Sequence, residues 1–478
     1  MWGAGGSRRL LGVFPRHLEN TMRTILGALA LTAALLPAPA ATAAAEPQAP
    51  SPGPPPVAPA VVTHDVAFTT GDGQRLGGRI FVPPGARGRL PGLLLIHGSG
   101  KGRPWRALET EAVEFARQGM VVLAPDKRAA GYSKTRRDFG QLADDALRAF
   151  AVLRARPEVD PAKAGVWGLS EGGWVAPIAA ARSADVKFLI TVGGPGFGAL
   201  RTQAWNMVNK LDRAGIEGSV RSVLGRELYR LTSDAGLFPG DRADAAGTLR
   251  RVRQPVLAIW GDRDDQVPPA ESAEVFRANV PGSLTVRFLG GGHTLWVSGR
   301  DKADALAPGY ASTVGGWVRD VTAGRVPPSS AGAAPAQRSL SRDLPPSAWW
   351  EGWRAQLAAA ALLVGVFAGY LVTGLRRRAV PSRAGRAFAV LGLVTVPGTL
   401  LGAFQMIGAA NGRGIDLGPL LAGRPVVWVV LQVLALATVV AGVVLARRWK
   451  ALPLRQRVLA AGGALFLPWA LHWGLLLP

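Results

Sequence analysis

The sequence contains no cysteine. This absence excludes disulfide bonds, thiolate metal sites and a cysteine nucleophile, although it is compatible with any redox compartment. Histidine is almost as scarce, because only five occur in the chain: His17, His64, His97, His293 and His472. Any function that needs an imidazole base must therefore draw on this short set.

Acidic residues are also few, since 32 Asp and Glu stand against 55 Lys and Arg and leave a net charge of +23. Such an excess can indicate nucleic-acid binding, but no basic run is interleaved with aromatic residues. The densest basic clusters flank hydrophobic stretches, where attraction to anionic lipid is the better explanation. Hydrophobic residues make up 48% of the chain, which is apolar for a soluble protein. We therefore expect contact with a lipid bilayer and no nucleic-acid partner.

The N-terminal residues 1–45 are interpreted as an upstream extension followed by a signal peptide. From Met22 a short basic start leads into an apolar core of about a dozen residues and then an alanine-rich cleavage region. The core is shorter than a bilayer span, and an uncleaved anchor is the alternative. Residues 46–61 form a Pro-rich linker, and residues 323–348 form a second linker rich in Pro, Ser and Ala.

Between the two linkers, residues 62–322 alternate apolar runs with amphipathic stretches. The runs are bounded by Gly or Pro and are apolar throughout, which is typical of strands buried on both faces. Strand–helix alternation predicts a mostly parallel sheet covered by helices, an α/β fold. Two further strands around a Gly-Asp-Gly turn are expected to pair antiparallel at one edge. The six predicted buried strands lie at 90–98, 120–126, 164–170, 186–194, 255–262 and 284–292.

Residues 195–250 interrupt the alternation, because they contain helical stretches and no strand-like run. An insertion at this point would lie above the carboxyl ends of the strands, where open α/β sheets bind ligands. We interpret it as a lid. A longer crossover connection without a gating role is the alternative.

Residues 349–478 are expected to form a membrane domain of about four transmembrane helices, since four apolar spans are each about 20 residues or slightly more, long enough to cross a bilayer. The spans lie near 353–375, 387–409, 425–446 and 457–477. Arginine and lysine concentrate in the loops after the first and third spans, which the positive-inside rule assigns to the cytoplasm. The α/β domain is then extracytoplasmic (periplasmic or extracellular), in agreement with the signal peptide.

Residues 168–172 read Gly-Leu-Ser-Glu-Gly and match the pattern G-x-S-x-G. With 61 glycines in the chain, the pattern needs a structural context to carry meaning. Ser170 ends a predicted strand and precedes a helical stretch, which is the context of a nucleophile elbow. Gly168 and Gly172 would relieve crowding at that sharp turn and let the hydroxyl project alone. Ser170 is therefore the candidate nucleophile.

A serine nucleophile needs a base, and the base needs an acid that orients it. Outside the signal, the first strand and the last span, the histidines that remain are His97 and His293. His293 stands in a glycine-rich loop after the last strand, so its imidazole can reach the serine at the carboxyl edge. The acid should lie between the two in the chain, in "GDRDDQVPP". Asp264 fits best, and Asp262 or Asp265 remains open.

Backbone N–H groups form the candidate oxyanion hole. The segment His97-Gly98-Ser99-Gly100 follows an apolar strand, and its small residues let amide groups face a developing negative charge. The expected donors are the N–H groups of Ser99 and of Glu171, the residue after the nucleophile. His97 itself is then interpreted as a brace of the loop.

With these residues in place, residues 62–322 resemble the α/β-hydrolase superfamily. The motifs HGSG, GLSEGG, GDRDDQVP and GGGH occur in the order typical of that superfamily, and the surrounding helices are similar to those of dienelactone-hydrolase-like esterases and prolyl-oligopeptidase-like peptidases. The resemblance implies the triad Ser170, Asp264 and His293 and hydrolysis through an acyl-enzyme, with no metal and no cofactor. The C-terminal spans have no counterpart in typical soluble members.

The leading hypothesis is an outward-facing serine hydrolase with a small-molecule acyl ester as substrate and a bilayer as its support. A peptidase, an aminopeptidase or a thioesterase with the same triad is the nearest alternative. An acyltransferase that uses lipid-borne acyl groups is a further alternative. A non-catalytic sensing module coupled to the spans is the weakest of these, because the sequence supplies every member of a triad.

Overall fold

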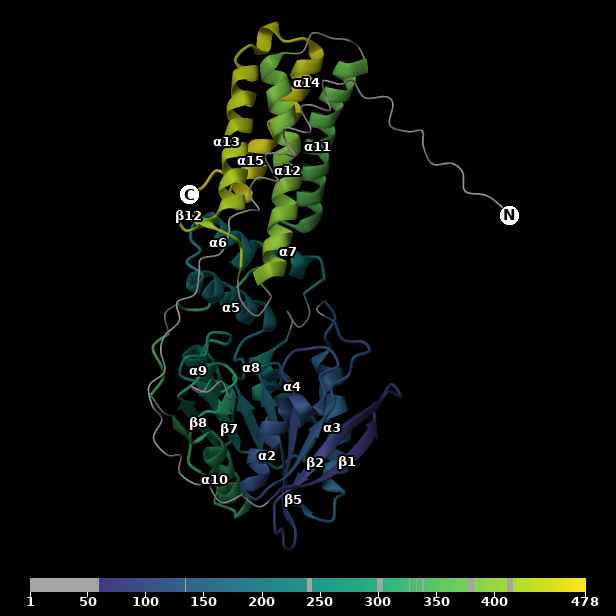
Figure 1. The fold of residues 1–478 in the computed structure, drawn as a ribbon, viewed down its shortest axis with the longest axis vertical. Coiled ribbons are helices and arrows are strands. Elements are labelled where there is room, and N and C mark those ends of the chain that lie inside the picture. Colours follow the sequence, from purple (N-terminus) through teal and green to yellow (C-terminus); the bar gives the residue numbers. More distant parts are fainter. Residues whose placement is uncertain are drawn as a thin grey trace, which may run out of the picture. The chain divides into compact units, whose positions relative to one another are not determined.

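The computed structural model describes residues 60–478 except 134, 239–242, 299–303, 326, 332, 338, 377–381 and 411–415. The predicted signal peptide, and the Pro-rich linker up to residue 59, therefore lie outside the described residues. The described residues belong to one compact unit, whose elements are drawn in Figure 1.

Nine strands form one sheet in the order β1-β2-β4-β3-β5-β6-β7-β8-β11. Strands β3 to β8 run parallel, and β1, β2 and β4 pair antiparallel. This arrangement confirms the predicted mostly parallel sheet with an antiparallel edge. The bounds are β1 Val62–Thr69, β2 Arg75–Val82, β3 Leu90–Ile96, β4 Val121–Pro125, β5 Val159–Leu169, β6 Leu189–Val192, β7 Val256–Gly261, β8 Leu284–Leu289 and β11 Ser330–Ala331.

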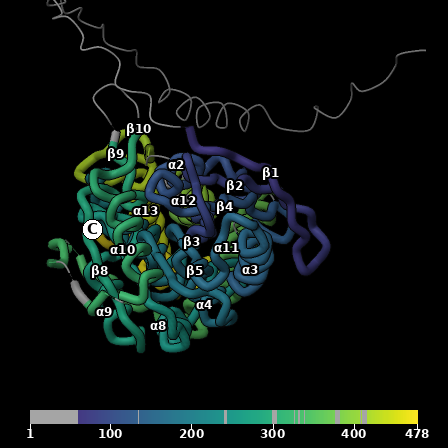
Figure 2. Tube along the Cα trace, turned by 90° about the horizontal axis from the view of Figure 1, so that it is seen from below, coloured from purple at the N-terminus to yellow at the C-terminus, as the bar shows by residue number. Residues whose placement is uncertain are grey.

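Helices cover both faces of the sheet, and Figure 2 shows α4, α8 and α9 on one side and α2 on the other. Val166 and Trp167 are neighbours on β5 that belong to the cores of opposite faces, since successive strand side chains point to opposite sides. This two-sided burial explains why the strand runs are apolar throughout. The remaining elements of this part are a 3₁₀ turn Trp105–Leu108, α2 Glu109–Arg117, α3 Phe139–Arg154, α4 Gly172–Arg182, α8 Ala245–Leu249, α9 Pro269–Asn279, α10 Tyr310–Thr322 and the short pair β9 Trp296–Ser298 and β10 Asp304–Leu306.

The insertion at 195–250 is helical, and its described residues include no strand. It comprises α5 Ala199–Arg213, α6 Ser219–Ser222, a π-helical turn Val223–Glu227, α7 Leu228–Asp234 and α8. Apolar side chains from α5 to α7 are buried in the same hydrophobic core as side chains of the C-terminal helices. The insertion is thus packed on two sides, on the sheet domain through α8 and on the C-terminal helices through α5 to α7.

Among the described residues, three helices are long and apolar enough to cross a membrane, at Trp353–Leu375, Arg383–Met406 and Val426–Ala446. They lie within α11 Trp353–Arg376, α12 Arg383–Ala410 and α13 Val426–Ala446. The predicted fourth span is wrong as a continuous helix. Residues 454–472 form two short helices, α14 Leu454–Gly463 and α15 Phe466–His472, with a 3₁₀ turn Trp449–Ala451 before them and a small hairpin β12 Leu420–Leu421 and β13 Arg424–Pro425 before α13.

The break between α14 and α15 has a local cause. Gly462 and Gly463 end α14, and Pro468 in the first turn of α15 has no N–H to donate to the carbonyl oxygen of Ala464, so the helical hydrogen-bond ladder is interrupted there. The residues after α15 contact the insertion, because the carbonyl oxygen of Pro478 accepts a hydrogen bond from Ser219 N (3.0 Å). Gly423, which precedes α13, is held there too, by Glu217 N (2.8 Å). The two short helices therefore replace the expected fourth span.

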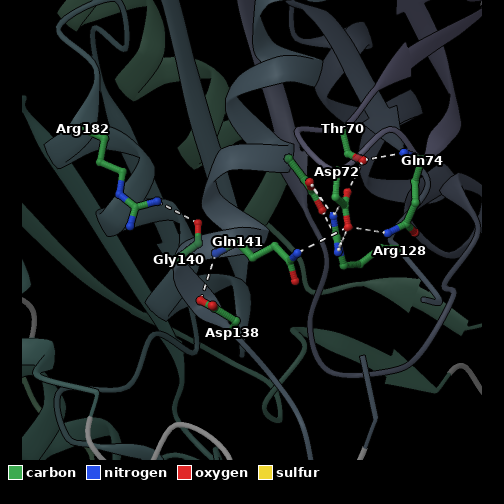
Figure 3. Close-up of polar contacts among 9 residues, drawn as sticks. Thr70, Asp72, Gln74, Arg128, Asp138, Gly140, Gln141 and Arg182 are labelled. Carbon is green, nitrogen blue, oxygen red and sulfur yellow. Dashed lines mark hydrogen bonds and ion pairs between the residues drawn. The ribbon is translucent and has the colours of Figure 1, made fainter. Parts of the chain in front are cut away.

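A buried guanidinium ties the edge of the sheet to its helices (Figure 3). Arg128 follows β4 and is 2% exposed. Its Nε and Nη2 donate to Asp145 on α3 at 2.5 and 3.0 Å, and its Nη1 and Nη2 donate to Asp72 at 3.0 and 2.9 Å. Asp72 lies in the turn between β1 and β2 and also accepts from Thr70 and Gln74. One side chain thus connects the antiparallel hairpin, β4 and α3.

We predict that Arg128→Met destabilises the fold by about 3–5 kcal/mol, because it leaves two carboxylates without their buried partner. The control is Arg117→Met, which removes a half-exposed ion pair with Glu114 and should cost about 0–1 kcal/mol. Unfolding of the detergent-solubilised chains in guanidinium chloride measures both changes in the free energy of unfolding. Equal midpoints for the two variants would contradict the assignment.

Candidate active site

The turn that carries Ser170 is strained and crowded. Ser170 follows β5 and has a φ of 56°, a left-handed value that non-glycine residues rarely adopt. A Cβ on Gly168 would lie 2.1 Å from the carbonyl oxygen of Gly172, and a Cβ on Gly172 would lie 2.5 Å from that of Ile96. Only glycine fits at both positions, so the motif glycines have the steric role expected of them. The strained turn is anchored by the bond from Ser170 N to Val192 O (2.8 Å).

Asp264 and His293 are brought together from the ends of neighbouring strands β7 and β8. His293 Nδ1 lies 2.8 Å from Asp264 Oδ2, and both residues are 6% exposed. The other oxygen, Oδ1, accepts the backbone N–H groups of Gln266 (2.9 Å) and Val267 (3.0 Å). The carboxylate is thus fixed on one side by its own turn and points its free oxygen at the imidazole.

The second ring nitrogen of His293, Nε2, is buried and has no hydrogen-bond partner among the described residues. The ring lies against Gly193, where an added Cβ would be 2.7 Å from Cε1. Gly193 directly follows Val192, whose carbonyl holds Ser170 N. Since β5, β6, β7 and β8 are parallel neighbours, Ser170, His293 and Asp264 all stand at one carboxyl edge.

The two other candidate acids are engaged elsewhere. Asp262 Oδ1 accepts from Gly291 N (2.9 Å) and so ties down the glycine-rich loop before His293. Asp265 forms an ion pair with Arg213 on α5. Asp264 is therefore the aspartate that contacts the imidazole.

The loop after β3 lies directly against the candidate nucleophile, Ser170. A Cβ on Gly98 would be 3.4 Å from the Cβ of Ser170, which places the neighbouring Ser99 beside the same turn. His97 is buried, and its Nε2 lies 2.7 Å from Pro125 O on β4. Burial lowers the pKa of His97 to about 3, so the ring is neutral near pH 7. This geometry supports the interpretation of His97 as a brace.

The sequence predicted a role for the backbone N–H of Glu171 but gave no prediction for its side chain, which makes several buried polar contacts. Glu171 is 1% exposed. Its carboxylate pairs with Lys127 Nζ (2.5 Å), accepts from Tyr132 Oη (2.9 Å) and pairs with Arg137 Nη1 (3.1 Å). Burial also raises the pKa of Tyr132 to about 12, so its hydroxyl stays protonated and can donate.

The same cluster holds the loop after β3. Lys127 Nζ donates to Gly98 O at 2.7 Å, and Tyr132 Oη accepts from Gly100 N at 3.1 Å. Strand β3 lies between β4 and β5, so Lys127 at the end of β4 reaches across that loop to Glu171. Both segments that would supply oxyanion donors are therefore clamped by one set of buried side chains. A lone acidic residue inside an apolar elbow was the sequence signal that could have revealed it.

A cavity of about 550 Å³ borders the elbow helix, and its lining includes Gly173, Trp174, Pro195 and Arg137. Ser170, Asp264 and His293 are not among the described residues that line it. The cavity is thus a neighbour of the candidate triad, and the strained turn and the Asp264–His293 bond locate the site instead.

We predict that Lys127→Met costs about 3–5 kcal/mol, because it removes the buried cation that pairs with Glu171 and leaves the part-exposed Arg137 as the charged partner of a buried carboxylate. Removing that charge as well, in Lys127→Met/Glu171→Gln, should recover part of the loss. The control is Lys163→Met, whose ion pair with Asp160 is part-exposed and should contribute about 0–1 kcal/mol. Thermal unfolding of the natural chain, the single variant, the double variant and the control measures these effects. If Lys127→Met were as stable as Lys163→Met, the role of Lys127 in holding the two segments would be refuted.

Known proteins resemble this chain over the sheet domain. Residues 106–310 match the family model described as the prolyl oligopeptidase family. An uncharacterized protein of Mycobacterium tuberculosis is 38% identical over 244 residues, which cover 51% of this chain and 77% of that protein. A polyketide transferase of Penicillium crustosum is 36% identical over 137 residues, 27% of this chain and 43% of that enzyme.

The chain therefore spans less than half the length of that transferase. Among solved structures, an esterase of Pyrococcus furiosus aligns with a TM-score of 0.38 at 19% identity, covering 54% of this chain and 92% of that one. The described sheet and the family match both fall on the part of the chain that carries the motifs. The chain belongs to the α/β-hydrolase superfamily, as a hydrolase related to the prolyl oligopeptidase family and to the mycobacterial protein.

Proposed function

We propose that the chain is a membrane-anchored serine hydrolase that cleaves carboxylic esters with Ser170, His293 and Asp264. One observation carries the proposal. His293 is held through Nδ1 by the buried Asp264, while its Nε2 is buried and unpartnered among the described residues, and the Cε1–Nδ1 edge of the ring packs against Gly193. An imidazole that is oriented by a carboxylate, has its other nitrogen free and packs on the glycine after the residue that anchors Ser170 is suited to general-base catalysis.

The proposed reaction proceeds through an acyl-enzyme. The Ser170 hydroxyl attacks the ester carbonyl while His293 Nε2 accepts its proton, and Asp264 stabilises the resulting imidazolium. The N–H groups of Ser99 and Glu171 would stabilise the oxyanion that forms. His293 then protonates the leaving alcohol, and water repeats the sequence on the acyl-enzyme to release the acid and regenerate Ser170.

A second reaction uses the same intermediate. The polyketide transferase relative favours transfer of the acyl group to an alcohol or amine acceptor in place of water. A peptidase activity is consistent with the matched family. A panel of p-nitrophenyl esters, acyl thioesters with added acceptors, and fluorogenic peptides separates the three, and turnover confined to the peptides would overturn the ester assignment.

We also propose that a signal peptide exports the sheet domain and that it faces the outside. The insertion is bonded to residues at one end of the C-terminal helices, because Arg230 pairs with Glu351 before α11 and Ser219 N bonds to Pro478 O. The basic loop after α13 lies at the other end of that helix. Since basic loops stay in the cytoplasm, this separation supports an extracytoplasmic sheet domain.

We predict that Ser170→Ala lowers the hydrolysis of a short p-nitrophenyl ester by about 10³-fold or more in the full-length chain, because no nucleophile remains. A fluorophosphonate probe should label the natural chain and not this variant. Ser183→Ala, at the end of α4, is the matched control and should behave like the natural chain. Persistent turnover or labelling without Ser170 would sink the assignment.

The absence of cysteine permits a direct test of orientation. Ser312→Cys on α10 and Lys450→Cys in the basic loop are exposed single-cysteine reporters. A membrane-impermeant maleimide applied to intact cells should label the first and spare the second until the membrane is permeabilised. The reverse pattern would place the sheet domain in the cytoplasm.

A further inference from the structure

Helix α5 presents two different faces. Arg201, Trp205, Asn209 and Arg213 recur every fourth residue and therefore form one stripe along the helix. Ala204, Met207 and Leu211 form a second stripe, and they are buried in the core that also contains side chains of α11, α12 and α13. A helix with two such faces joins the elements that cover them.

The polar stripe holds the turn that carries the candidate acid. Asn209 Nδ2 donates to the backbone carbonyl of Asp265 at 3.2 Å, and the Arg213 guanidinium pairs with the Asp265 carboxylate. Asp265 directly follows Asp264, and the next two backbone N–H groups bond to Asp264 Oδ1. Both the main chain and the side chain of one residue in this turn are thus fixed by α5.

The same stripe continues to the linker that leads into the membrane helices. Arg201 donates to Ser341 Oγ at 2.7 Å and pairs with Asp343 at 2.9 Å and with Glu271 on α9 at 3.1 Å. Trp205 Nε1 donates to Ser339 O at 2.8 Å. These residues of the linker are therefore attached to α5, although the sequence predicted only a spacer.

The segment after α5 is bonded to the membrane helices directly. Ser219 Oγ accepts from Trp428 Nε1 on α13 at 3.2 Å and from Gln432 Nε2 at 3.4 Å. Glu217 N donates to Gly423 O at 2.8 Å. A continuous set of contacts therefore runs from α13 through Ser219 and α5 to the turn of Asp264.

We propose that the membrane domain helps to position the catalytic acid through α5, with Asn209 and Arg213 as positioning residues. The inference rests on the proposed function, because it assigns a regulatory role in that same site. The spans then do more than anchor the enzyme: a change in their packing shifts α5, and the shift alters the aim of Asp264 at His293. The Arg213–Asp265 pair is half-exposed, so it contributes little to folding, whereas a displacement of about 1 Å at a catalytic group can cost 10²-fold in rate.

The test uses the full-length chain in proteoliposomes and a water-soluble p-nitrophenyl ester. We expect Asn209→Ala/Arg213→Gln to lower kcat about 10-fold or more with KM and melting temperature little changed. Arg213→Lys retains the ion pair and should restore most of the activity. Arg221→Gln is the control, because Arg221 pairs with Asp212 in the same insertion.

A second variant tests the membrane side of the set. Trp428→Phe/Gln432→Leu removes both donors to Ser219, should also lower kcat, and should show a non-additive effect when combined with Arg213→Gln. Unchanged kcat in either the α5 variant or the α13 variant overturns the proposal, as does simple additivity. If the natural chain has no ester turnover at all, the proposed function fails first, so the two failures are distinguishable.

Discussion

The close approach of three backbone segments around Ser170 is the constraint on which the site depends. The strand before it, the helix after it and the end of β3 come so near that Gly168 and Gly172 have no room for a side chain. Ser170 itself is held at a positive φ, and such strain persists only where the surroundings determine it. The parallel sheet supplies those surroundings, because its neighbouring strands bring the loop after β3, the Asp264 turn and the His293 loop to the same edge.

Buried charge is the second requirement of this edge. Glu171 and Arg128 are almost fully buried, and each is surrounded by several oppositely charged or hydrogen-bonding groups. Such groups are tolerated only when paired, so they restrict the fold to arrangements in which all partners meet. Lys127 and Arg128 are consecutive residues that belong to two such clusters, one beside the candidate oxyanion donors and one at the sheet edge. The segment after β4 therefore connects several elements of the sheet domain, although it carries no member of the proposed triad.

The insertion connects the C-terminal helices to the sheet domain. Helices α5 to α7 share a core with the C-terminal helices, while α8 packs on the sheet domain. Hydrogen bonds from Glu217 and Ser219 to Gly423 and Pro478 close this junction. The turn of Asp264 and the three candidate spans are thus both attached to α5 and the segment after it, which is the basis of the proposed coupling.

Periodicity and local sterics in the sequence determined the alternating strands and helices, the elbow at Ser170 and the order of the motifs. They also indicated three of the membrane helices, but hydropathy alone could not show that the fourth span is interrupted after Gly463. Only the tertiary structure decided that Asp264 contacts His293 and that Lys127 pairs with Glu171, since these partners are far apart in the chain. The physical reason is that a sequence pattern indicates whether a side chain is buried or requires a partner. Strand order and packing then determine which residue is that partner.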